Sequence, residues 1–89
     1  MNNYALLNFM GGRIEGRPLG IGIIGVGHVG REVYERTRQL DPNRAVVRHV
    51  AVREPGNYRG IVDNRLLTTD VKSMIGDRRM DILVEVAGG

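Results

Sequence analysis

An apolar segment that runs directly into three closely spaced glycines constrains the fold of this 89-residue chain more than any other feature. Residues 19–24 are only leucine, isoleucine and glycine, which is typical of a buried strand. Gly25, Gly27 and Gly30 follow with the spacing G-x-G-x-x-G, and a helical pattern begins at residue 28. A strand, a tight turn and a helix in this order predict the first half of a parallel βαβ unit.

The three glycines have separate mechanical roles in such a turn. Gly25 permits the sharp turn, Gly27 lets a ligand approach the backbone, and Gly30 lets the helix pack closely on the strand. Free N–H groups and the helix dipole favour an anion at the start of the helix. The segment therefore predicts a site for the pyrophosphate of a dinucleotide. Its expected contacts are Gly25, Val26, Gly27, His28, Val29 and Gly30.

The remaining chain continues the alternation of strands and helices. A helix is expected over residues 28–40, with an outer i,i+4 pair of Glu32 and Arg36. Strands are expected over residues 45–52, 66–68 and 81–87, and a short helix from a Thr69 or Asp70 cap to residue 75. The residues expected to align on one face of the first helix are Val29, Val33, Thr37 and Leu40. The order predicts an α/β fold, a partial Rossmann-like (doubly wound) and mainly parallel sheet.

Residues 1–18 show no clear periodicity and are rich in glycine, which predicts a flexible lead-in. Residues 14–17 match the recognition sequence of a protease that is used to remove tags, so this segment is either native or an engineered remnant. We therefore set residues 1–17 aside and expect one nucleotide-binding domain over residues 19–89. A complete doubly wound domain is usually larger, so this domain is expected to be incomplete.

The composition argues against several other classes of protein. The absence of cysteine excludes a disulfide framework and a thiolate metal site, and it fits a reducing, cytoplasmic compartment. No apolar run reaches the roughly 18–20 residues of a membrane span. The net charge of +3 comes from arginines interleaved with acidic residues, which favours a mixed-charge surface over a nucleic-acid site. No residue spacing indicates a metal site or a catalytic nucleophile.

The end of the second strand carries the residue that distinguishes NADP from NAD. Arg53 lies where a planar guanidinium could pair with the 2′-phosphate of NADP. Glu54 is the rival, because a one-residue shift of the strand end would place its carboxylate on the ribose and favour NAD. The sequence favours NADP and leaves NAD open.

Two histidines and a terminal glycine pair allow more than one interpretation. The His28 imidazole could touch the pyrophosphate, but the simpler alternative is that only its backbone N–H takes part. His49 is most simply a packing or surface residue of the second strand. Gly88 and Gly89 follow the last strand, where ligands bind in open α/β sheets. They either pass close to the nicotinamide or form an ordinary flexible end.

Together these segments resemble the N-terminal nucleotide-binding part of homoserine dehydrogenase. The matching stretches are residues 23–30, 50–53, 66–70 and 81–89. The glycine turn is shared by many dehydrogenases, whereas Leu-Thr-Thr-Asp followed by Val-Glu-x-x-Gly-Gly is more specific to this family. The resemblance implies a strand order of 3-2-1-4. It also implies that NAD(P) is bound by the glycine turn, Arg53, Thr68, Ala87, Gly88 and Gly89.

The resemblance also implies an activity, the interconversion of homoserine and aspartate 4-semialdehyde in threonine and methionine biosynthesis. The family's catalytic lysine and acidic substrate-binding residues lie downstream of the Gly-Gly pair. No catalytic residue can therefore be carried over, and the chain alone is expected to be inactive. A missing catalytic domain or a homo-oligomer is the expected protein partner. The alternatives are another amino-acid-pathway reductase, a non-catalytic NAD(P)-sensing module, and a gene remnant that does not fold stably.

Overall fold

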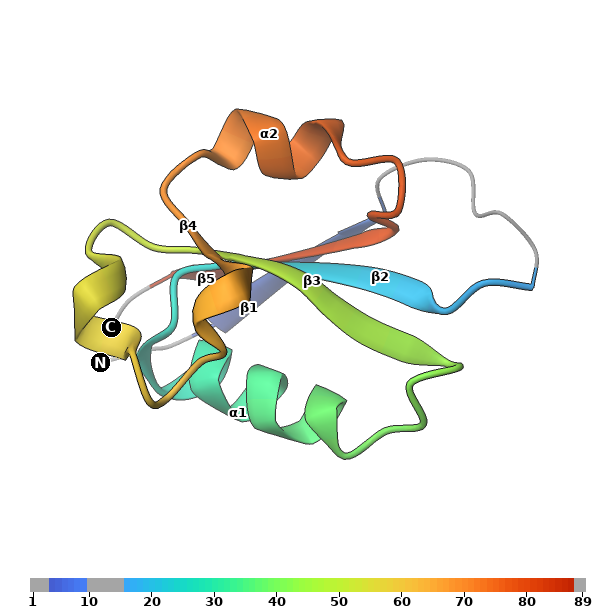
Figure 1. Cartoon of the computed structure of the whole chain (residues 1–89), viewed down its shortest axis with the longest axis horizontal. Coiled ribbons are helices and arrows are strands. Elements are labelled where there is room, and N and C mark those ends of the chain that lie inside the picture. Colours follow the sequence, from blue (N-terminus) through green and yellow to red (C-terminus); the bar gives the residue numbers. More distant parts are fainter. Residues whose placement is uncertain (1–3, 10–15, 88–89) are drawn as a thin grey trace.

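A computed structural model describes residues 4–9 and 16–87 of the chain. Its strands form one sheet in the order β1-β5-β2-β3-β4, with α1 on one face and α2 on the other (Figure 1). The strands are β1 (Tyr4–Phe9), β2 (Leu19–Ile24), β3 (Ala45–Ala51), β4 (Leu67–Thr68) and β5 (Ile82–Ala87). The helices are α1 (Gly27–Arg38), α2 (Val71–Gly76) and the single 3-10 turns η1 (Pro55–Tyr58) and η2 (Asn64–Leu66).

The parallel part of the sheet has the predicted topology. β2 lies between β3 and β5, and β4 pairs with the outer side of β3, all of them parallel. Numbered from the first strand after the lead-in, this order is 3-2-1-4. The α/β, Rossmann-like prediction is therefore confirmed, and the predicted element ends differ from the observed ones by only one or two residues.

The sheet contains one strand that the sequence analysis did not expect. β1 lies within residues 1–18 and pairs antiparallel with β5, from Tyr4 opposite Ala87 to Phe9 opposite Ile82. An uncovered β5 edge would present a row of unpaired backbone groups, which β1 satisfies. This pairing joins segments far apart in the sequence, so local periodicity gives little sign of it.

Arg17 also belongs to the folded unit, although residues 1–17 were set aside. Its guanidinium donates to both oxygens of the Asp81 carboxylate, at 2.7 and 2.8 Å, and to the carbonyl of Arg79 at 3.0 Å. The Asp81 side chain is only 3% exposed and also accepts the backbone N–H of Gly20 at 2.8 Å. Arg17 and Asp81 thus tie the start of β2 to the turn before β5.

The core between α1 and the sheet is built around Tyr34, Ile23 and Val50, which are almost fully buried. α1 buries Gly30, Tyr34 and Thr37. The expectation that Leu40 aligns with this face is wrong, because α1 ends at Arg38 and Leu40 is 52% exposed. The predicted outer pair is confirmed, with Arg36 Nη2 lying 3.0 Å from Glu32 Oε1.

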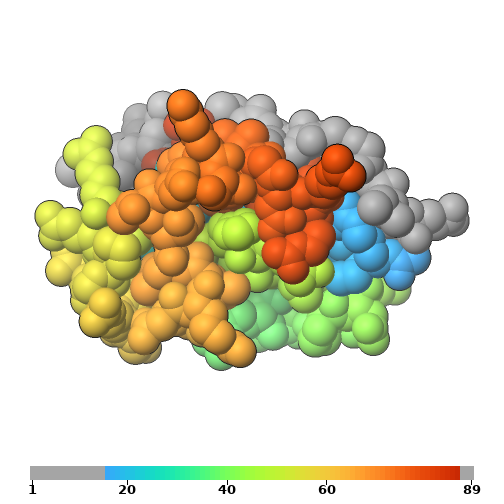
Figure 2. All heavy atoms as spheres, turned by 45° about the horizontal axis from the view of Figure 1, so that its top comes forward, coloured from blue at the N-terminus to red at the C-terminus, as the bar shows by residue number. Residues whose placement is uncertain are grey.

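The core between α2 and the sheet is smaller and rich in methionine. Met74, Met80, Leu83 and Ala51 form it. The glycines of β2 leave room for it, because a Cβ at Gly22 would overlap the end of the Met80 side chain. Asp70, one of the two predicted caps, caps α2 by accepting the N–H of Ser73 at 3.0 Å. In Figure 2, α2 and the residues after it (orange to red) lie over the middle of this face.

A β-bulge at Arg48 decides which side chains of β3 face each core. Ile21 pairs with Val47 but Gly22 pairs with His49, so one residue of β3 is left over. Because of this extra residue, Val47 and Val50 both reach the α1 core. His49 Nε2 instead lies 2.7 Å from the Asp77 carboxylate. The interpretation of His49 as a packing or surface residue misses this pairing.

Three carboxyl groups accept hydrogen bonds that lower their pKa values. The Arg65 side chain and N–H lower the pKa of Asp63 to about 2. The N–H and hydroxyl of Ser73 lower the pKa of Asp70, and Arg79, with a smaller contribution from His49, lowers that of Asp77. Each group has a lower pKa in the folded chain than in the unfolded chain, so its ionised form stabilises the fold.

We therefore expect the urea midpoint to stay nearly constant from about pH 7 to pH 5 and to fall as the pH drops from about 4 toward 2. Urea unfolding followed by circular dichroism across this range measures the effect. Asp77→Asn removes one of the three groups and should make the acid-induced fall shallower. A midpoint that rises on acidification would contradict the assignment.

Candidate functional site

The carboxyl ends of β2, β3 and β5 enclose two adjoining hollows, which we call the strand-end cleft. The larger hollow has a volume of about 580 Å³ and lies between the glycine turn, η1 and β5. The smaller one, of about 390 Å³, reaches Thr69 and Val71 at the start of α2. Both hollows share Gly25, Val52, Arg53 and Val86. In Figure 1, β2 and β3 both run toward this edge, where η1 and the start of α1 also lie.

The glycine turn has the geometry that its spacing predicts. Gly25 has a φ of +83° and Gly27 a φ of +42°, a region that disfavours residues with a Cβ. The N–H of Gly25 donates to the carbonyl of Ala51 at 2.8 Å, which fixes the turn against the end of β3. A Cβ at Gly30 would lie 2.8 Å from the carbonyl oxygen of Gly25, so this residue allows the close approach of α1. Contact of these residues with a cofactor stays a prediction.

The backbone N–H groups at the N-terminus of α1 are available to a hydrogen-bond acceptor. Val26 occupies the cap position without a capping side-chain hydrogen bond, and the first turn contains no acidic residue. His28, in this first turn, is exposed, and Val29 is half-buried. The N–H groups of a first helical turn have no partner within the helix, so they favour an anion here.

Arg53 and Glu54 follow β3 at the cleft, and their side chains differ in whether they have a hydrogen-bond partner. Arg53 is exposed, lines both hollows, and within residues 4–9 and 16–87 its guanidinium has no hydrogen-bond or ion-pair partner. Glu54 Oε2 accepts a hydrogen bond of 2.9 Å from the side-chain amide of Asn57. The cation is therefore available to a ligand, whereas the carboxylate is already engaged on η1.

The structure does not bring every predicted residue into the cleft. Thr68 is half-buried, its hydroxyl accepts the N–H of Asp70 at 2.9 Å, and Thr69 rather than Thr68 lines the smaller hollow. Ala87 ends β5, and Gly88 and Gly89 lie outside the described residues. The contacts predicted for these four residues stay predictions.

Four residues that line the larger hollow had no site role in the sequence analysis: Val52, Asn57, Tyr58 and Val86. Val86 alternates in β5 with Val84, so its direction follows once the sheet is known. The Pro-Gly pair after Glu54 indicated only a turn or loop. It gave no sign that the turn would close with Asn57 against Glu54.

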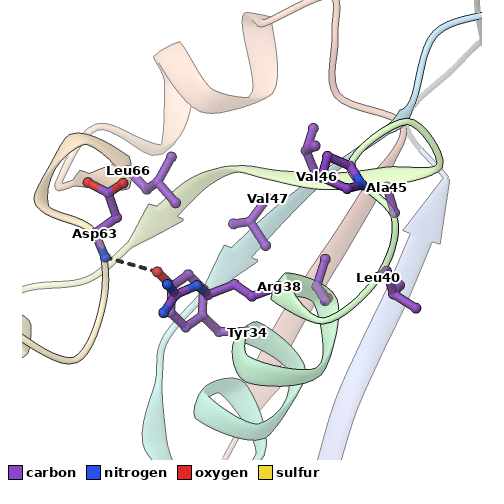
Figure 3. Close-up of a pocket in the computed structure, with 10 residues that line it drawn as sticks. Tyr34, Arg38, Leu40, Ala45, Val46, Val47, Asp63 and Leu66 are labelled. Carbon is purple, nitrogen blue, oxygen red and sulfur yellow. Dashed lines mark hydrogen bonds between the residues drawn. The ribbon is translucent and has the colours of Figure 1, made fainter.

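A third hollow lies away from the glycine turn, between α1 and β3 (Figure 3). It has a volume of about 160 Å³, and in it the Tyr34 hydroxyl accepts the N–H of Asp63 at 3.0 Å. The Arg38 guanidinium lies 5.4 Å from the centre of the Tyr34 ring. These contacts tie the loop before η2 to α1, so we assign this hollow a structural role.

Within residues 4–9 and 16–87, no helix is long and apolar enough to cross a bilayer. Over the same residues, no three side chains of His, Cys, Asp or Glu gather closely enough to hold a metal ion.

The parallel order 3-2-1-4, the glycine turn and the strand-end cleft define a Rossmann-like α/β unit. It is similar to homoserine dehydrogenases of Mycobacterium tuberculosis and Mycobacterium bovis, with 33% identity over 79 residues. The match includes 81% of this chain and 18% of the relatives, so the chain spans less than a fifth of their length. No protein-family model matches the chain, and no solved structure matches it significantly.

Proposed function

We propose that the strand-end cleft binds a nicotinamide dinucleotide and that the chain is the cofactor-binding part of an oxidoreductase like homoserine dehydrogenase. One observation carries this proposal: the uncapped N-terminus of α1 follows a positive-φ glycine turn at the mouth of the cleft. The similarity to homoserine dehydrogenases supports it independently. The volume of the cleft falls within the range of about 300–1,000 Å³ for ligand pockets.

The residues present suit two parts of such a cofactor, the pyrophosphate and the adenosine. The pyrophosphate would take the N–H groups of the first turn of α1, where no carboxylate repels it. The adenosine would lie in the larger hollow, between the glycine turn and η1, with Tyr58 on its wall. His28 contributes its backbone N–H in this arrangement, and its exposed imidazole has no assigned role.

Within this proposal NADP is the preferred cofactor. Arg53 offers a planar guanidinium, with no partner among the described residues, that matches the oxygens of a 2′-phosphate. The rival Glu54 already accepts a hydrogen bond from Asn57 with one oxygen of its carboxylate. An NADP site is therefore favoured by the availability of Arg53 as well as by its position.

The nicotinamide would lie beyond the end of β5, near Ala87, Gly88 and Gly89. When bound, this ring would supply the hydride chemistry of the reaction. We assign no catalytic role to any residue of this chain; its residues bind and orient the cofactor. The interconversion of homoserine and aspartate 4-semialdehyde also requires the substrate to be held against the ring. We propose that this activity belongs to a larger assembly in the cytoplasm, and that the chain alone does not turn over substrate.

The first test is a two-dimensional amide NMR titration of the whole 89-residue chain with NADP⁺ and then with NAD⁺. The whole chain is required because Arg17 and β1 belong to the folded unit. We expect dispersed peaks and ligand-dependent shifts of the amides of Gly25, Gly27, Gly30 and Arg53. The amide of Gly76, at the end of α2, provides an internal reference that should not move. A well-dispersed spectrum that responds to neither nucleotide would overturn the proposal.

A further inference from the structure

Two side chains of opposite charge stand next to each other at the cleft, yet they do not pair. Among the residues that the structure describes, Arg53 has no ionic partner. The neighbouring Glu54 carboxylate is bound by the Asn57 amide at 2.9 Å. A third residue, Asn57, thus holds the carboxylate that is next to the cation in the sequence.

The backbone of η1 places Asn57 in position for this contact. Pro55 begins η1 and fixes its own φ, and the N–H of Asn57 donates to the Glu54 carbonyl at 3.0 Å. The same residue thus holds both the main chain and the side chain of Glu54. Gly56 lies between them in open space, so no side chain competes for the carboxylate there. Residues 54–57 thus form a turn that one backbone and one side-chain hydrogen bond hold together.

We infer that Asn57 is a positioning residue that sets the nucleotide preference of the cleft. It holds the Glu54 carboxylate on η1, away from both the Arg53 guanidinium and a ribose hydroxyl. This inference rests on the proposed function, because it concerns the same cofactor. Without the Asn57 amide, Glu54 is free to pair with Arg53, to repel a 2′-phosphate and to accept an unmodified 2′-hydroxyl. All three effects favour a nucleotide without the 2′-phosphate over one that carries it.

The test uses two probes that differ only in this phosphate, 2′,5′-ADP (adenosine 2′,5′-bisphosphate) and 5′-AMP. Calorimetric titration of the whole chain gives the ratio of their two affinities. We expect Asn57→Ala to lower the preference for 2′,5′-ADP about threefold to tenfold, as one exposed charge-assisted hydrogen bond warrants. Asn64→Ala is the matched control, since Asn64 is exposed on η2 and lines neither hollow of the cleft.

A second pair of variants isolates the mechanism. Glu54→Gln removes the charge that Asn57 restrains, so adding Asn57→Ala to it should leave the affinity ratio unchanged. A merely structural role of Asn57 predicts instead that both probes weaken equally in either background. Equal weakening, or an unchanged ratio in the single Asn57→Ala variant, would overturn the inference. If the wild-type chain bound neither probe nor NADP⁺, the proposed function itself would fail.

Discussion

Gly20→Ala is expected to remove most of the stability of the fold. A Cβ at this position would overlap the carbonyl oxygen of Arg79 and lie 2.8 Å from the carbonyl carbon. This obstacle is backbone and not the end of a flexible side chain, and the same turn is held by Arg17 and Asp81. Gly20 itself is fixed by its N–H to Asp81 Oδ2 and its carbonyl to Asp81 N–H, both at 2.8 Å. Neither side of the overlap can move without breaking these bonds.

The expected loss is on the order of 4 kcal/mol, which is most of the stability of a small domain. Urea unfolding followed by far-ultraviolet circular dichroism measures it. Gly76→Ala is the control, because nothing lies within 4 Å of a Cβ there, and it should change the midpoint little. A Gly20→Ala variant with the wild-type midpoint would show that the turn before β5 does not approach β2 as described.

Arg53→Ala is expected to weaken the binding of NADP⁺ about 30-fold to 100-fold, the size of a bidentate bond to a phosphate. The affinity for NAD⁺ should change less than about threefold, since its ribose offers no charge for Arg53 to neutralise. Isothermal titration calorimetry or an amide NMR titration of the whole chain measures the dissociation constants of both nucleotides. The fold should be unaffected, because the side chain is exposed and pairs with no described residue.

Arg59→Ala is the matched control for this variant. It removes the same charge from an exposed arginine just after η1, but Arg59 lines neither hollow of the cleft. Its effect on both nucleotides should be small and should fade as salt is added. If Arg53→Ala weakened both nucleotides equally, Arg53 would have no role in distinguishing them.

The positions of the parallel strands were predictable from the sequence because they depend on local signals. The apolar run before Gly25, the valines of β3 and the Asp70 cap each mark an element within a few residues. The family resemblance then supplied their arrangement in space. The glycine turn was equally predictable, since the sharp turn after β2 requires a positive φ, which Gly25 adopts.

Long-range contacts account for what the sequence did not reveal. Arg17 and Asp81 lie 64 positions apart, and only the folded sheet brings them together. The bulge at Arg48 depends on the register of two strands, so β3 alone does not show which face His49 takes. The partner of Glu54 is close in sequence, but its geometry depends on the 3-10 turn that Pro55 begins.

The position of β1 has a consequence for any larger sheet that contains this unit. In a complete doubly wound sheet of order 3-2-1-4-5-6, the neighbour of the fourth strand is a fifth parallel strand. That fourth strand is β5 here, and its outer edge is already taken by β1 in the antiparallel direction. One edge can pair with only one strand at a time, so β1 and a fifth parallel strand exclude each other. Extension of the sheet on this side therefore requires residues 4–9 to give up all their pairing with β5.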